Sequence, residues 1–178
     1  MTATQAAAGD NPLPGDNIDV LVEQLADGEE RPRGPRFGTL VHALIADAPL
    51  ELSDPEVLNR LAAAHGRVLG ATRDEIEAAS VVVERVLHHP LCIRAARASQ
   101  AGRCYRETPI TLRLASGVLI EGTVDLAFEE DDEITVIDFK TDRELAGDLP
   151  VYRRQLQIYA HAIATATDRP ARGVLMKI

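Results

Sequence analysis

Two opposite charges stand at the end of an apolar run in the stretch Val136-Ile-Asp-Phe-Lys-Thr-Asp142, written VIDFKTD. The run itself is typical of a buried strand. Residues two apart in a strand project to the same face of a sheet, so Asp138 and Lys140 are expected on one side, where the strand ends. The simpler alternative is a strand that enters a polar turn, with Asp138 and Lys140 as an ordinary ion pair.

A second carboxylate, Asp125 in Gly122-Thr-Val-Asp125, belongs to the preceding predicted strand. The acidic stretch 129–133 is predicted to be the hairpin loop, and folding about Asp131 brings residue 125 roughly opposite residue 137 or 138. Two carboxylates that converge in a partly dry place repel each other unless a cation lies between them. Such hard oxygen ligands suit Mg²⁺ or Mn²⁺, and Lys140 beside that ion could orient or deprotonate a water.

The elements that must position these side chains follow from hydrophobic spacing and capping signals. Helices are predicted over 37–48, from Ser53 to a stop at Gly66, from the capping box at Thr72 to His88, and over 90–99. Strands are predicted over 106–115, 118–128 and 134–139, then a helix over 150–167 and a last strand over 173–178. The order helices, βββ, αβ predicts an α/β fold with a mixed sheet and an N-terminal helical section.

Alternation within the second strand predicts which side chains share a face. One side is expected to carry Ile120, Val124, Leu126 and Phe128, and the other side Glu121, Thr123 and Asp125.

Composition bounds the domain organisation. The chain has 178 residues, of which 46% are hydrophobic, so one folded domain is expected. Residues 1–35, rich in Ala, Gly, Pro and acidic residues, are predicted to be a flexible tail or linker with at most one short docked segment, and 36–178 the folded domain. No membrane-length apolar run or signal pattern is visible, so a cytoplasmic protein without membrane contact is expected.

Three motifs in this order resemble the PD-(D/E)XK nuclease superfamily, and most of all its RecB-like branch, the C-terminal nuclease domain of AddA- and RecB-type helicase–nucleases. The G-x-x-D aspartate of that family matches Asp125, and its D-x-K pair matches Asp138 and Lys140. Its Q-x-x-x-Y pair matches Gln155 and Tyr159.

The resemblance implies further site residues. The family's metal-ligand histidine, in a G-x-x-x-H context, matches His42, and a family glutamate matches Glu107. The implied metal ligands are His42, Asp125, Asp138 and the backbone carbonyl of Phe139. Glu107 and the Gln155–Tyr159 pair are implied to contact DNA or to support the ligands.

Taken alone, these additional residues also have plain structural interpretations. His42 fits a surface histidine at the edge of an apolar stripe. Gln155 and Tyr159 fit a hydrogen-bonded pair at the core edge, and Glu107 fits an edge-strand charge.

The family also implies an activity and partners. A restriction-endonuclease-like core is expected, with Mg²⁺- or Mn²⁺-dependent deoxyribonuclease activity, as an exonuclease in DNA end processing and recombinational repair. The net charge of −9 is unusual for an independent DNA binder. This charge favours an arrangement in which a helicase motor domain or partner subunit delivers single-stranded DNA to the site. The basic residues expected to line a DNA track are Arg31, Arg33, Arg36, Arg143, Arg153 and Arg154.

Two departures and two alternatives accompany this interpretation. Some RecB-like relatives carry four cysteines for an iron–sulfur cluster, whereas this chain has two, so no cluster is expected. No G-x-x-x-x-G-K-[ST] phosphate loop occurs, so the motor is not expected within this chain. The alternatives are a catalytically inactive copy of the fold that binds DNA or serves as a scaffold, and a metal-dependent enzyme acting on another phosphate ester.

Overall fold

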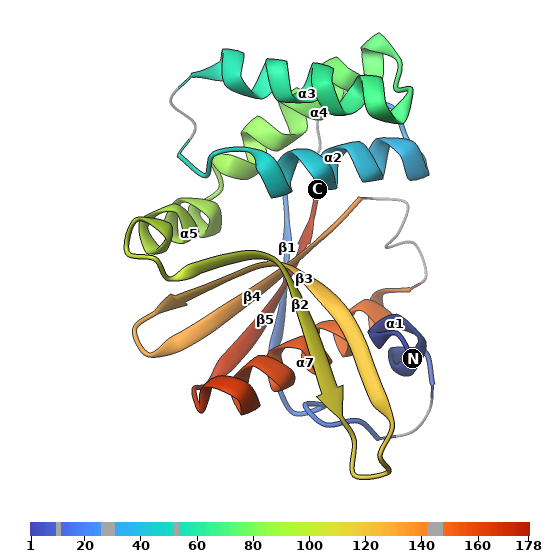
Figure 1. The fold of residues 1–178 in the computed structure, drawn as a ribbon, viewed down its shortest axis with the longest axis vertical. Coiled ribbons are helices and arrows are strands. Elements are labelled where there is room, and N and C mark those ends of the chain that lie inside the picture. Colours follow the sequence, from blue (N-terminus) through green and yellow to red (C-terminus); the bar gives the residue numbers. More distant parts are fainter. Residues whose placement is uncertain (10–11, 26–30, 52–53, 142–147) are drawn as a thin grey trace.

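A five-stranded mixed sheet with the order β1-β5-β4-β3-β2 forms the centre of the protein (Figure 1). The computed structural model describes all residues except 10–11, 26–30, 52–53 and 142–147. The helices are α1 (Ala3–Ala7), α2 (Pro35–Asp47), α3 (Pro55–Leu69), α4 (Arg73–Leu87), α5 (Pro90–Gln100) and α7 (Leu149–Thr167). The strands are β1 (Val20–Gln24), β2 (Cys104–Arg113), β3 (Leu119–Glu130), β4 (Glu133–Lys140) and β5 (Ala171–Lys177).

The predicted order of helices, βββ and αβ is confirmed. Strands β2, β3 and β4 form an antiparallel meander, and β5 pairs in parallel with β4. The β3–β4 register pairs Glu130 with Glu133 and ends at Leu126 and Ile137. Asp125 and Asp138 are therefore next in line where the two strands stop pairing, as folding about Asp131 predicts.

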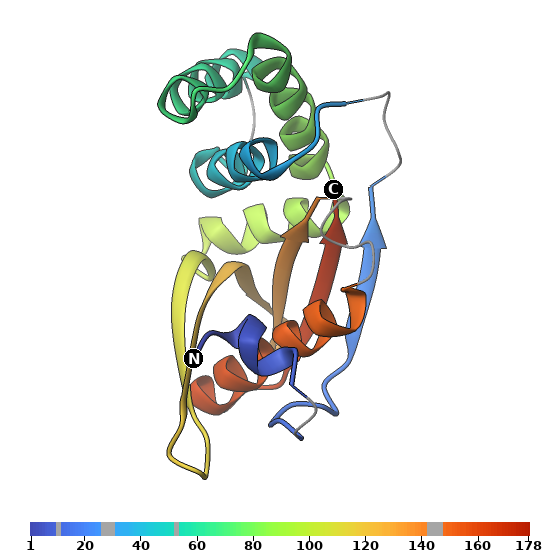
Figure 2. The ribbon, with the colours of Figure 1, turned by 90° about the vertical axis from the view of Figure 1, so that its right-hand side faces the viewer.

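Helices cover both faces of the sheet (Figure 2). The first core lies between α2–α5 and one face, and it includes Leu126, Phe128, Ile137 and Phe139. The second core, which we call the α7 core, lies under α1 and α7 and includes Ile120, Val124, Val136 and Leu156. Within the described part of the chain, no helix is both long and apolar enough to cross a membrane.

The β2–β3 pair changes faces in the middle. Val124 lies in the α7 core whereas Leu126 lies in the first core, although side chains two apart in a regular strand share a face. Opposite this point, Glu107 of β2 has a φ of 47°, which is unusual for a residue other than glycine. The prediction that Ile120 and Val124 share a face with Leu126 is therefore wrong, because an irregularity at Glu107 and Asp125 interrupts the alternation.

Two described segments within residues 1–35, helix α1 and strand β1, pack on the fold, where a flexible tail with one short docked segment was the prediction. Strand β1 pairs in parallel with β5, with Val20 opposite Gly173, and it forms one edge of the sheet. Helix α1 packs against α7, and the Glu121 N–H donates a hydrogen bond to the Met1 carbonyl at 3.0 Å. A parallel pairing between segments this far apart in sequence leaves no local pattern, which explains why a docked segment but no strand was predicted here.

The predicted stop of helix α3 at Gly66 is wrong, because the helix continues to Leu69. Gly70 caps the helix, and its φ of 63° lies in the left-handed region that favours glycine. Gly66 instead permits close packing of α3 on α4, because a Cβ there would lie 2.4 Å from Cγ1 of Ile76.

Candidate active site

Two carboxylates, one buried and one partly buried, meet where β3 and β4 diverge. Asp138 stands near the end of β4 with 4% of its surface exposed. Asp125 Oδ2 accepts a hydrogen bond of 2.9 Å from the N–H of Phe139, the residue that follows Asp138. The side chain of Phe139 is fully buried in the first core. This packing fixes the backbone that holds Asp125 in place.

Lys140 lies on the same side of β4 as Asp138, as strand alternation predicts. Its Nζ is 2.6 Å from Asp138 Oδ2. The contact is a buried ion pair, in which the Lys140 ammonium lies directly against the Asp138 carboxylate.

Helix α2 brings His42 to the same place. His42 Nδ1 is 3.6 Å from Asp125 Oδ2, and both side chains are partly exposed. One turn earlier, Gly38 faces Thr141 at the end of β4, where a Cβ would lie 3.7 Å from the threonine Oγ1. The chain end is also held here, since the Ile178 N–H donates to the Lys140 carbonyl at 2.9 Å.

The electrostatics show that the two acids affect each other. Burial, followed by the charge of Asp125, raises the pKa of Asp138 to about 6, against the opposing effect of Lys140. Burial also raises the pKa of Asp125, and the charge of Glu107 adds to this, while His42 opposes it. The site therefore carries excess negative charge in a poorly hydrated place.

Helix α7 closes the site with Gln155 and Tyr159. Gln155 Nε2 donates a hydrogen bond to Tyr159 Oη at 2.8 Å, and both side chains are buried. The Tyr159 ring lies over Gly122, where a Cβ would be 2.6 Å from Cε1 and 2.7 Å from Oη of the tyrosine. The Q-x-x-x-Y pair and the glycine of G-x-x-D are thus parts of one contact. Their predicted role toward DNA remains a prediction.

Tyr152 also belongs to this site, although none of the sequence motifs includes it. The Lys140 Nζ lies 5.0 Å from the centroid of its ring. The available signal was an aromatic side chain three residues before Gln155, which places both on one face of the helix.

The remaining predicted residues are placed as follows. Glu107 contributes to the field at Asp125 from the irregular point of β2. Three of the predicted track residues are engaged within the protein: Arg31 donates to the Ile178 carbonyl, Arg36 pairs with Glu75, and Arg154 donates to the Ala7 carbonyl.

The other three track residues have no contact that tests their predicted role. Arg33 and Arg153 are exposed. Arg143 lies outside the described residues.

The residue types fit a hard divalent cation. Two carboxylates and one imidazole converge, and carboxylate oxygens with an imidazole nitrogen are ligands that Mg²⁺ or Mn²⁺ accepts. As they stand, no three His, Cys, Asp or Glu side chains of the described ranges are close enough together to hold a metal. Asp125 is engaged by His42 and the Phe139 N–H, and Asp138 by Lys140.

Comparison with known proteins gives consistent matches. A family model described as the PD-(D/E)XK nuclease superfamily matches residues 20–178. The chain is 27% identical over 164 residues to an ATP-dependent helicase/nuclease subunit of Bacillus cereus (strain ATCC 10987 / NRS 248), covering 76% of this chain and 13% of that protein. The protein of the same name from Alkaliphilus oremlandii (strain OhILAs) is 24% identical over 183 residues, covering 87% of this chain and 15% of that protein. The chain thus corresponds to a small part of these relatives.

Proposed function

Because the chain belongs to the PD-(D/E)XK nuclease superfamily, we propose that it is a nuclease domain that uses Mg²⁺ or Mn²⁺ to hydrolyse phosphodiester bonds of DNA. The observation that carries this proposal is the pair of adjacent carboxylates at the end of the β3–β4 pairing, the buried Asp138 with Lys140 against it and the partly buried Asp125 with His42 beside it. A structural ion pair between Lys140 and Asp138 would not account for the second carboxylate and the imidazole beside it.

His42, Asp125, Asp138 and the carbonyl of Phe139 are the proposed cation ligands. A bound Mg²⁺ or Mn²⁺ would supply Lewis acidity to the scissile phosphate and to the attacking water. With Asp138 engaged as a ligand, Lys140 Nζ is available to hold the water and to offset negative charge on the phosphate oxygens.

Supporting roles fall to residues around the ligands. The Phe139 N–H keeps Asp125 aimed at the end of β4. Glu107 adds negative charge beside Asp125, and Gln155 with Tyr159 keeps α7 against β3 over Gly122. We assign Glu107, Gln155 and Tyr159 to DNA contact or to support of the ligands.

The relatives suggest the wider context. Both are named as components of an ATP-dependent helicase/nuclease, and the chain covers only 13% to 15% of them. We propose that a helicase motor, as a further domain or a partner subunit, delivers single-stranded DNA to this site for exonucleolytic degradation in cytoplasmic DNA end processing and repair. Delivery by a motor would make a net charge of −9 acceptable, since the site need not capture DNA alone.

The direct test is a cleavage assay with labelled single- and double-stranded DNA, linear and circular, in Mg²⁺ or Mn²⁺. The wild type is compared with Asp138→Ala and Lys140→Ala. Cleavage of linear single strands by the wild type only is the expected result. DNA binding without cleavage would favour the inactive-copy alternative, and a Lys140→Ala variant that cuts at the wild-type rate would overturn the proposed mechanism. Hydrolysis of nucleotides with DNA left intact would favour the other phosphate-ester alternative.

A further inference from the structure

Lys140 is held from two directions by groups of different character. On one side, its Nζ lies 2.6 Å from Asp138 Oδ2. On the other side, the face of the Tyr152 ring lies 5.0 Å away, within the range of a cation–π contact. Only 12% of the lysine side chain is exposed, so little water screens either contact.

Asp138 and Tyr152 behave differently toward Lys140 when a cation enters. Asp138 is a proposed cation ligand, and its attraction for the ammonium falls when its charge is shared with Mg²⁺ or Mn²⁺. An aromatic face attracts an ammonium through its quadrupole and is a poor ligand for a hard divalent cation. Of these two groups, the ring therefore keeps its contact with the lysine throughout.

Helix α7 is well placed to supply that partner. Tyr152 lies in its first turns, where its N–H donates to the Asp148 carbonyl at 3.0 Å. Gln155 and Tyr159 follow at helical spacing on the same face and pack over Gly122 of β3. The same helix therefore contacts β3 through Tyr159 and β4 through Tyr152, which links the positions of both strands.

We infer that Tyr152 is a positioning residue that holds the Lys140 ammonium at the reacting phosphate through the face of its ring. This inference rests on the proposed nuclease function. The role requires an aromatic face but not the phenolic hydroxyl, which separates it from a proton-transfer role and from simple space filling.

The test compares Tyr152→Phe, which keeps the ring face, with Tyr152→Leu, which keeps apolar bulk only. Steady-state cleavage of single-stranded DNA is measured at saturating Mg²⁺. The expected result is a kcat for Tyr152→Phe within about 2-fold of wild type and a kcat for Tyr152→Leu lower by about 5- to 20-fold, with KM for DNA changed little. Equal kcat values for Tyr152→Leu and wild type would overturn the inference, as would equal losses in both variants.

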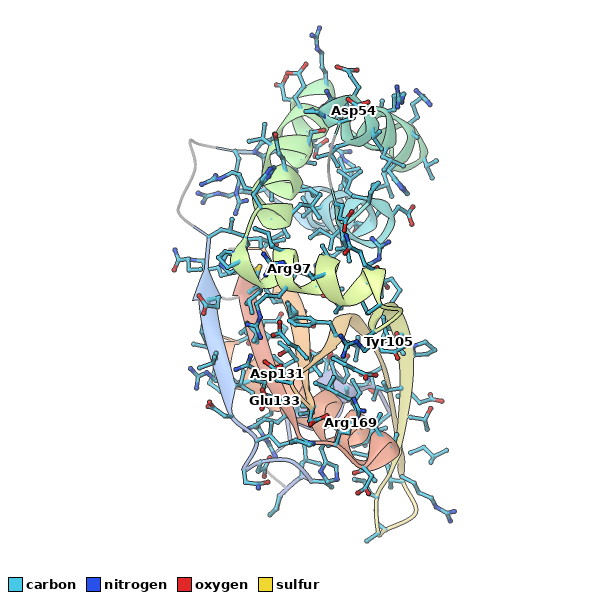
Figure 3. All side chains as sticks on the ribbon, turned by 90° about the vertical axis from the view of Figure 1, so that its left-hand side faces the viewer. Asp54, Arg97, Tyr105, Asp131, Glu133 and Arg169 are labelled. Atoms are coloured by element: carbon cyan, nitrogen blue, oxygen red, sulfur yellow. The ribbon has the colours of Figure 1, made fainter. Side chains whose placement is uncertain are left out.

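Tyr105→Leu is the matched control, because it removes an aromatic ring far from Lys140 in the chain. Tyr105 lies on the edge strand β2, with 45% of its surface exposed and its hydroxyl bonded to Glu129 at 3.0 Å (Figure 3). The kcat of the Tyr105→Leu variant is expected to match that of the wild type. A wild type without nuclease activity would end the proposed function and leave the Tyr152 contact to be decided by the second measurement.

The second measurement is a double-mutant cycle of unfolding that needs no cleavage. Tyr152→Leu and Lys140→Met are combined, and urea midpoints are compared for the four proteins. Tyr152→Leu is expected to lower the midpoint less in the Lys140→Met background than in the wild type. Equal shifts in both backgrounds would show that the ring does not act on Lys140. If Tyr152→Leu fails to fold, Tyr152→Met replaces it in both experiments.

Discussion

The Phe139 N–H donates a hydrogen bond of 2.9 Å to Asp125 Oδ2. This bond directly connects β3 and β4, the two strands that carry the aspartates of the site. Phe139 lies between Asp138 and Lys140, and its ring is buried in the first core. The backbone that carries Asp138 and Lys140 therefore also aims Asp125. Changes in core packing under Phe139 are therefore expected to displace the side chains of Asp125, Asp138 and Lys140.

Loss of the Asp138 charge should abolish cleavage without unfolding the domain. Asp138→Asn keeps the shape but removes a cation ligand, so we expect the cleavage rate in Mg²⁺ to fall by at least about 100-fold. The matched control is Asp131→Asn at the β3–β4 turn, where φ is 49° and asparagine is well tolerated. Near-normal cleavage by Asp138→Asn would contradict its role as a ligand.

The stability of the metal-free domain should depend on pH through Asp138. Burial and the Asp125 charge raise its pKa from 3.8 to about 6 in the folded state. Between these values the folded state binds more protons than the unfolded state, so stability falls as pH rises from about 4 to 6. Urea unfolding at a series of pH values should show a steeper fall in the protein that keeps Asp138 than in Asp138→Asn, where the raised pKa of Asp125 still contributes. A slope unchanged by the substitution would show that other groups cause it.

Metal binding should show the opposite trend with pH. A cation must displace the proton from Asp138, and burial also raises the pKa of Asp125, so protons compete with the cation in acid. The thermal stabilisation produced by Mg²⁺ or Mn²⁺ is expected to be larger at pH 7 than at pH 5. Equal stabilisation at both values would place the cation away from these acids.

Two glycines of the site should respond differently to alanine. A Cβ on Gly122 would lie 2.6 Å from the Tyr159 ring, so we expect Gly122→Ala to cost about 1–3 kcal/mol of unfolding free energy. A Cβ on Gly38 would meet Thr141 at an ordinary 3.7 Å, and alanine favours the helix, so Gly38→Ala should be neutral or stabilising by up to about 1 kcal/mol. Thermal unfolding measures both. Combining Gly122→Ala with Tyr159→Leu should cost less than the sum of the single changes if the ring is the obstacle.

Sequence periodicity predicted the centre of the site and missed its surroundings for identifiable reasons. Strand alternation put Asp138 and Lys140 on one side, and counting along the hairpin put Asp125 next to them. Both patterns are local, so a single sequence contains them. The change of faces at Glu107 was not predictable, because a glutamate at positive φ has no composition signal. The Lys140–Tyr152 contact joins a strand to a helix across the intervening residues 142–147, and no periodicity links such segments.

The N-terminal segment provides a test of the domain boundary, since the family match begins only at residue 20. Ala3 and Ala7 are buried against the α7 core. Arg154 donates to the carbonyl of Ala7 at 3.1 Å, and the Met1 amine donates to the Leu119 carbonyl at 3.0 Å. A flexible tail would make no such contacts.

Deletion of residues 1–9 should therefore lower the melting temperature by about 3–10 °C, because it exposes apolar surface of α7 and leaves carbonyl and guanidinium groups without their partners. The change should be mimicked in part by Arg154→Ala, which keeps the segment but removes the hydrogen bonds that Arg154 donates to it, whereas Arg153→Ala on the exposed side of the same helix should have little effect. Differential scanning calorimetry on the four proteins measures this order. A deletion variant that melts with the wild type would show that residues 1–9 are a tail after all, and that the folded unit begins at β1.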